Sequence, residues 1–239
     1  MKKLWARKTK WSLALVTFAI LTLSGYVLAV PPFNFGVHPF EFDPFQTKLV
    51  SAQWVNGAGC PTGATTNDGT TSSTFTDDAC PAGTGDPQDN NNKGLVLFKT
   101  GPTPNFAASG AFLTFNQKGF TLTEIGYDLR KGSHCGAGAP RFNIRTTTKF
   151  YFLGCNSPAP TTTLPGEGWN RLTWGDTVPV MAFCVSGVCA GVQPEAITEP
   201  IASISIIFDE GQDAAGGPDQ SGTAVLDNIN VNGTRQGKP

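Results

Sequence analysis

The amino-acid sequence predicts an all-β protein, a two-sheet antiparallel β-sandwich that is jelly-roll-like and stabilised by disulfides. Short runs that alternate apolar and polar residues recur along the 239-residue chain, and no amphipathic helical period accompanies them. The 28 glycines and 18 prolines separate these runs, as turn-forming residues do between short strands. Six cysteines complete the pattern, because cysteines of an exported chain are generally paired.

Residues 1–29 have the pattern of a secretory signal peptide. The opening MKKLWARKTK carries five basic residues and no acid, an apolar stretch follows, and the small Val27 and Ala29 precede the predicted cleavage point. The alternative is an uncleaved anchor, since the apolar stretch approaches the about 20 residues that span a bilayer. We expect a secreted or periplasmic protein that has no membrane contact after cleavage.

Cleavage would make the protein acidic. Loss of the five basic residues leaves 12 lysines and arginines against 18 acids, a formal net charge of −6. Nucleic acids and anionic membranes attract basic surfaces, so neither is an expected partner.

The remaining chain divides into an arm and one domain. Residues 30–46, VPPFNFGVHPFEFDPFQ, are rich in Phe and Pro and predict an extended arm, either packed on the sandwich or presented to a partner. Residues 47–239 predict a single β-sandwich domain with a long polar loop at 56–92. Its strands are expected at 47–54, 94–99, 111–116, 121–129, 141–146, 149–155, 169–174, 201–209 and 223–231.

The spacing of the cysteines suggests three local disulfides, although sequence alone does not fix the connectivity. The expected pairs are Cys60 with Cys80, Cys135 with Cys155, and Cys184 with Cys189. A zinc site is not expected, because the chain has no CxxC motif and its two histidines, His38 and His134, are far apart in sequence.

The stretch SHCGAGAPRFNI (133–144) could suggest a thiol nucleophile with its base, because His134 precedes Cys135. Side chains at adjacent positions of an extended chain point apart, however, and Cys135 has an expected disulfide partner. The glycines and Pro140 are typical of a tight bend. We therefore predict a structural bend, with His134 at the rim of a groove.

Two acids of one predicted strand, Glu124 and Asp128, bear on glycosidase chemistry. They lie on one strand face about 13 Å apart, which is too far for the carboxylate pair of a glycosidase. If the next predicted strand lies alongside, they are expected to pair with Arg141 and Arg145.

The glycine-rich stretch FDEGQDAAGGPDQSG (208–222) predicts a calcium site. Asp209, Glu210, Asp213 and Asp219 supply the hard oxygen ligands that Ca²⁺ prefers. The alternative is a solvated acidic hairpin loop. Asp227 stands apart from this loop, on the more apolar side of its predicted strand, and needs a partner there.

From Lys48 to Pro239 the chain resembles a group of uncharacterised secreted bacterial β-sandwich proteins. The motifs that carry the resemblance are LVLFKTGPTPNFAASGA, GYDLRKGSHCGAGAPRFNI, FDEGQD and AVLDNINVNG. The last of these is also similar to the final strand of jelly-roll carbohydrate-binding modules. That similarity implies that Asp227 ligates a structural calcium, with Glu41 and Asp43 as counterparts of the modules' N-terminal ligands.

These features together predict a non-catalytic domain that binds a glycan or another cell-surface ligand. Sugar rings have apolar C–H faces edged by hydroxyls, which suit exposed aromatic rings beside polar groups. The expected binding face contains Tyr127 and Trp169, with Arg141, Arg145 and His134 as polar partners; the alternative for each tryptophan is a core position. Two other functions remain open: a structural or adhesive surface protein that assembles through residues 30–46, and a glycoside-active enzyme.

Overall fold

The computed structural model divides the chain into two compact units, Met1–Pro32 and Phe33–Pro239. It describes residues 32–59, 62–67, 72–76, 93–100, 106–136, 138–163, 168–209 and 222–237, with only the backbone at 62–67 and 72–76. The predicted signal peptide lies outside these ranges. Within them, no helix has the length and apolar character needed to cross a membrane.

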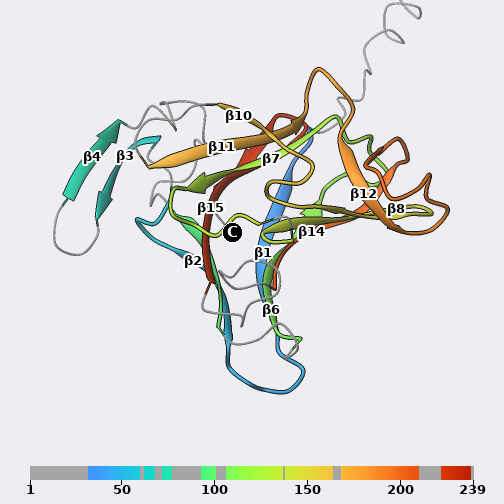
Figure 1. The fold of residues 1–239 in the computed structure, drawn as a ribbon. Helices are drawn as coiled ribbons and strands as arrows, with labels where there is room; N and C mark the ends of the chain where they lie inside the picture. The colour runs from blue at the N-terminus through green and yellow to red at the C-terminus, as the bar shows by residue number, and fades with distance from the viewer. Residues whose placement is uncertain are drawn as a thin grey trace, which may run out of the picture. The chain divides into compact units, whose positions relative to one another are not determined.

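The second unit consists of antiparallel β-sheets (Figure 1). Sheet A has the strand order β1 (Phe35–Phe42), β6 (Ala108–Phe115), β14 (Ile201–Phe208), β8 (Arg141–Thr146), β9 (Phe150–Leu153), β12 (Met181–Ser186) and β13 (Glu195–Ala196). Sheet B has the order β10 (Thr161–Thr163), β11 (Trp169–Gly175), β7 (Glu124–Arg130), β15 (Gly222–Val231), β5 (Gly94–Lys99) and β2 (Val50–Val55), and β16 (Thr234–Gln236) pairs with β15. Strands β3 (Thr62–Asn67) and β4 (Ser72–Thr76) form a separate hairpin inside the predicted polar loop.

The predicted fold class is confirmed. The chain crosses repeatedly between the sheets, from β5 in sheet B to β6 in sheet A, to β7 in sheet B and to β8 in sheet A. Such crossings place sequential strands in opposite layers, as in a jelly roll.

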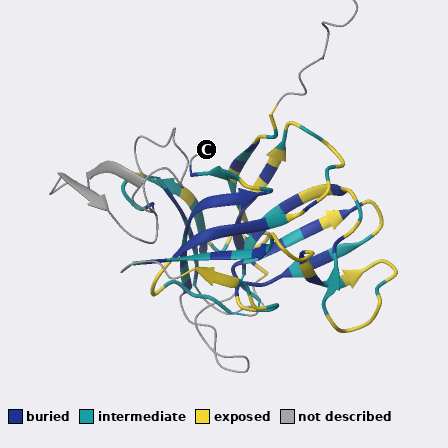
Figure 2. Ribbon diagram, turned by 90° about the horizontal axis from the view of Figure 1, so that it is seen from above, coloured by how far each residue is buried: buried dark blue, intermediate teal, exposed yellow. Residues whose placement is uncertain are grey.

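Period-two alternation explains which side chains form the core. In β8, Phe142 and Ile144 are fully buried between the sheets, whereas Arg145 is exposed on the opposite face of the strand. Figure 2 shows such alternation of buried and exposed residues along strands. A one-residue slip would turn the apolar set toward water, so the buried face fixes the register.

The N-terminal segment is part of the sandwich rather than a separate arm. Phe35–Phe42 forms β1, the edge strand of sheet A, and pairs with β6 along its whole length. Phe35 and Val37 enter the core, and the Trp54 indole N–H donates to the Val37 carbonyl at 3.3 Å. The predicted boundary between an arm at 30–46 and the domain is corrected for Phe35–Phe42, because Phe35 and Val37 alternate into the core and an edge strand tolerates proline.

Two of the predicted disulfides are confirmed. Cys135 bonds Cys155 with a Cα–Cα distance of 5.3 Å, and Cys184 bonds Cys189 with a distance of 5.6 Å. Cys60 and Cys80 lie outside the described residues. The bend at 133–140 is closed by the first disulfide and by the Gly136 N–H, which donates to the Ala139 carbonyl at 2.8 Å.

Candidate functional site

The two aromatic residues predicted to form a binding platform are buried. Tyr127 is 1% exposed, its ring packs against Phe142 and Trp174, and its hydroxyl donates to the Pro140 carbonyl at 3.1 Å. Burial raises the pKa of the Tyr127 phenol. Trp169 is 4% exposed. The prediction that these rings are exposed is therefore wrong, and no sugar can stack on them.

The predicted polar partners lie elsewhere. Arg141 and Arg145 are on the side of β8 that faces away from sheet B, whereas Tyr127 and Trp169 belong to sheet B itself. The His134 ring packs edge-on against Phe208, a core residue, with 5.7 Å between ring centroids. The five predicted residues do not form one site.

The outer face of sheet A instead carries a continuous row of side chains across six strands. Cross-strand pairing places these residues side by side: His38, Phe112, Ser205, Asn143, Phe152 and Phe183. Neighbouring strands lie about 4.8 Å apart, so the row extends over about 24 Å. We call this row, with the adjacent Phe40, Phe150, Arg141 and Arg145, the aromatic face.

A stacked pair of phenylalanines stands at the β1 end of the aromatic face. The rings of Phe40 and Phe112 have centroids 4.1 Å apart and an interplanar angle of 19°, and Phe112 is 53% exposed. Gly110 allows this approach, because a Cβ there would lie 2.9 Å from the Phe40 ring and 2.2 Å from the Ile206 carbonyl oxygen. Sequence reasoning missed Phe112, although it alternates out of phase with Ala111 and Leu113.

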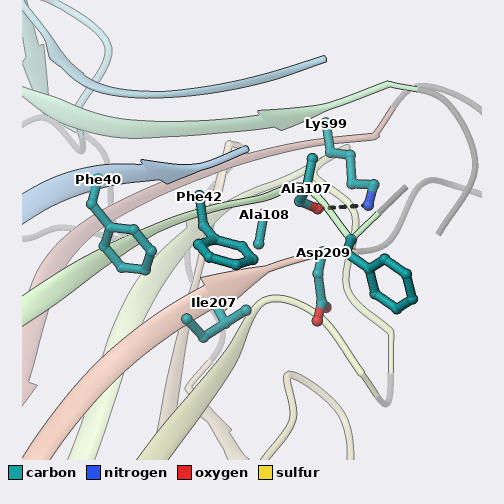
Figure 3. Close-up of a pocket in the computed structure, with 8 residues that line it drawn as sticks. Phe40, Phe42, Lys99, Ala107, Ala108, Ile207 and Asp209 are labelled. Atoms are coloured by element: carbon teal, nitrogen blue, oxygen red, sulfur yellow. Dashed lines mark hydrogen bonds between the residues drawn. The ribbon is translucent and has the colours of Figure 1, made fainter. Parts of the chain in front are cut away.

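A pocket of about 340 Å³ adjoins this pair (Figure 3). Its apolar lining comes mainly from Phe40, Phe42, Phe106 and Ile207. Lys99, which is fully buried, donates from Nζ to the Ala107 carbonyl at 2.7 Å, as the dashed line in Figure 3 marks. Lys99 and Asp209 complete the lining, so the pocket combines an apolar surface with two charged side chains.

At the centre of the aromatic face, Arg141 joins several groups. Its Nη1 and Nη2 donate to the two carboxylate oxygens of Asp209 at 2.6 and 2.8 Å, and its Nε donates to Asn143 Oδ1 at 2.9 Å. The same guanidinium lies 4.6 Å from the centroid of the Phe152 ring. These contacts hold a planar donor group flat on the sheet surface.

Sheet B has a polar cluster of its own, on the side of β7 opposite to Tyr127. Arg171 donates from Nε and Nη2 to the two oxygens of Asp128, each at 2.7 Å, and Asn228 Nδ2 donates to Asp128 Oδ2 at 2.8 Å. Desolvation lowers the pKa of Arg171, but the hydrogen bond and charge of Asp128 outweigh it, so the pKa is raised. Desolvation, and then the charge of Arg171, lower the pKa of Arg235.

The predicted pairing of Glu124 and Asp128 with Arg141 and Arg145 is wrong. The neighbours of β7 are β11 and β15, while β8 lies in the other sheet, so Asp128 meets Arg171 and Glu124 accepts from Asn230. Asp128 and Asp227 are cross-strand partners, but they are only 0% and 1% exposed. A glycosidic bond cannot reach this carboxylate pair.

The predicted calcium ligands are only partly within the described residues. The Asp209 carboxylate accepts from Arg141, and Asp227 Oδ1 accepts from the Asn228 N–H at 2.6 Å. The other predicted ligands lie outside the described ranges: Glu210, Asp213 and Asp219. Glu41 accepts from the Ala52 N–H. Asp43 closes a turn, and its carboxyl pKa is lowered chiefly by the hydrogen bond that it accepts from the Thr47 N–H. Within the described ranges no three His, Cys, Asp or Glu residues are grouped to hold a metal, so calcium remains a prediction.

Comparison with known proteins gives a weak structural likeness. No family model matches the chain, and no curated protein matches it. A solved structure of a family 11 carbohydrate-binding module from Clostridium thermocellum, in complex with a β-1,3-1,4-mixed-linked tetrasaccharide, is similar at 13% identity and a TM-score of 0.39. The alignment covers 87% of this chain and 92% of that one. At these values we draw no inference about the site from the likeness.

Proposed function

We propose that the protein is a secreted, non-catalytic domain that binds a polysaccharide through the aromatic face of sheet A. The observation that carries the proposal is the stacked Phe40–Phe112 pair on an outer sheet surface, where Phe112 is 53% exposed beside hydrogen-bonding side chains. Exposed aromatic planes suit the C–H faces of sugar rings, and amide, hydroxyl and guanidinium groups suit their hydroxyls.

The layout of the face fits an extended ligand. Phe112 and Phe152 are separated by β14 and β8, about 14 Å at the usual strand spacing. Ser205 and Asn143 lie between them and offer a hydroxyl and an amide. A polysaccharide lying across the strands would thus meet an apolar surface, then polar groups, then an apolar surface again.

A binding panel tests the proposal. The purified protein is incubated with insoluble and immobilised polysaccharides, with calcium and in parallel with chelator, and the bound fraction is measured. Retention on one polymer class is expected. Loss of retention in chelator would support the predicted calcium, and retention on no polymer in either condition would contradict the proposal.

Substitution locates the binding face. Phe112→Ala removes the exposed ring of the stack, and we expect affinity for the retained polymer to fall about tenfold, which corresponds to about 1.4 kcal/mol. Phe45→Ala is the matched control, because Phe45 is 66% exposed but lies outside the aromatic face. Equal losses in the two variants would show that the stacked pair is not the platform.

A second function, assembly through the N-terminal segment, is favoured by a different observation. Phe42, Phe45 and Phe106 are all more than half exposed, and the rings of Phe45 and Phe106 approach to 6.4 Å. Light scattering distinguishes this function, because Phe45→Ala would then change the size of the assembly and Phe112→Ala would leave that size unchanged.

A further inference from the structure

Two arginine–phenylalanine pairs lie next to each other on β8 and β9. The Arg141 guanidinium is 4.6 Å from the Phe152 ring centroid, and the Arg145 guanidinium is 4.9 Å from that of Phe150. The two phenylalanine rings contact each other edge to face, with centroids 5.3 Å apart. The four side chains form one cluster on the aromatic face.

The first pair shows how this surface holds a carboxylate. While Arg141 lies over Phe152, its Nη1 and Nη2 each donate to one oxygen of Asp209, at 2.6 and 2.8 Å. A guanidinium stacked on a ring keeps its edge available for such a two-pronged contact, because its donors lie in its own plane.

The second pair has the same arrangement without a carboxylate from the protein. Among the described residues Arg145 forms no ion pair, and its side chain is exposed. Its cross-strand neighbours are Ser203 on β14 and Phe150 on β9, so no acid stands directly beside it in the sheet. The nearby Lys149 is bonded to Glu195 at 2.7 Å, and Glu199 at this end of β8 accepts from the hydroxyls of Thr146 and Thr148 at 2.6 and 2.7 Å, so neither acid is paired with Arg145.

We propose that Arg145 and Phe150 form a subsite for the oxyanion of an acidic polysaccharide. A ligand carboxylate or sulfate ester accepts two hydrogen bonds from the Arg145 guanidinium, in the way that Asp209 accepts them from Arg141. This inference rests on the proposed function and names the class of polymer that the aromatic face selects. A neutral polymer would leave the Arg145 charge without a counterpart.

The test uses polymers that differ in charge but not in backbone. Polygalacturonate is compared with its fully methyl-esterified form, and dextran sulfate with dextran, by titration of the purified protein. We expect at least one charged polymer to bind tenfold or more tightly than its neutral counterpart, and which of the two does so identifies the oxyanion as carboxylate or sulfate.

Three variants connect this preference to the subsite. Arg145→Gln should abolish the difference between charged and neutral polymer, and Arg145→Lys should restore part of it, because lysine keeps the charge but lacks the fork. Arg130→Gln is the matched control, since Arg130 is an exposed arginine on sheet B. The thermal midpoints of the Arg145→Gln and Arg130→Gln variants should agree, which excludes unfolding as the cause.

The outcomes separate this inference from the proposed function. Equal binding of charged and neutral polymer would overturn the inference and leave polysaccharide binding standing. A preference that survives Arg145→Gln, or that is lost equally in Arg130→Gln, would do the same. Binding to none of these four polymers, with retention on another neutral polymer of the panel, would also overturn the inference alone. Failure to bind any polymer would overturn both.

Discussion

Replacement of Asp128 by alanine should destabilise the protein severely, because it leaves the Arg171 cation, whose side chain is only 15% exposed, without its partner. Asp128 is 0% exposed, and it accepts both hydrogen bonds of the Arg171 fork at 2.7 Å as well as one from Asn228. Breaking a buried ion pair from one side costs about 3–5 kcal/mol, since the remaining charge is desolvated and unpaired. Arg235 increases the cost, because its pKa is already lowered by desolvation and by the charge of Arg171.

Equilibrium unfolding in urea measures this loss, with the slope of the transition checked for constancy. The double variant Asp128→Ala/Arg171→Met should be more stable than Asp128→Ala alone, because it removes the stranded charge. A loss below about 1 kcal/mol, the range of surface ion pairs, would refute the view that this cluster is a buried structural element. The same result would reopen sheet B as a ligand-binding surface.

Two further predictions concern the disulfides and pH. Removal of the Cys135–Cys155 bond, which joins residues 20 apart, should lower the free energy of unfolding in urea by about 3 kcal/mol. Removal of Cys184–Cys189, with a separation of 5, should lower it by about 2 kcal/mol. Equal losses, or a larger loss for the shorter loop, would contradict the loop-entropy reasoning. Hydrogen bonds from the Thr146 hydroxyl and, next in size, the Thr148 hydroxyl lower the pKa of Glu199 from 4.5 to about 2. A carboxyl group with a lowered pKa contributes its full stabilisation above pH 4.5 and loses it as the pH falls through about 2. The melting temperature should therefore decline in this window, and it should decline less in the Glu199→Gln variant.

The sequence predicted the strands well where one face is apolar. RFNIRT became β8 with Phe142 and Ile144 buried, as its alternation indicates. The same rule would have placed Tyr127 in the core, because it shares a strand face with Ile125 and Leu129, and Phe112 on the surface, because it shares one with Thr114. Strand parity therefore corrects the predicted position of Tyr127 and would have added Phe112, for which the sequence analysis made no prediction.

Other features depend on strand order, which local pattern does not determine. Arg141 and Asp209 are 68 residues apart and meet because β14 pairs with β8. The expected partnership of Asp128 with Arg141 or Arg145 failed for the same reason, since consecutive strands β7 and β8 lie in different sheets. Trp169 shares its strand face with the partly exposed Arg171 and Thr173 but is itself buried. The alternation of apolar and polar residues along a strand does not predict such local burial.

The most direct test of the central claim is a map of amide chemical shifts of ¹⁵N-labelled protein, titrated with an oligosaccharide of the polymer that it retains. If the aromatic face of sheet A is the binding surface, the perturbed amides will cluster at Phe112, Asn143 and Phe152, on β6, β8 and β9. Perturbations confined to Asp128, Arg171 and their neighbours on sheet B would contradict the account.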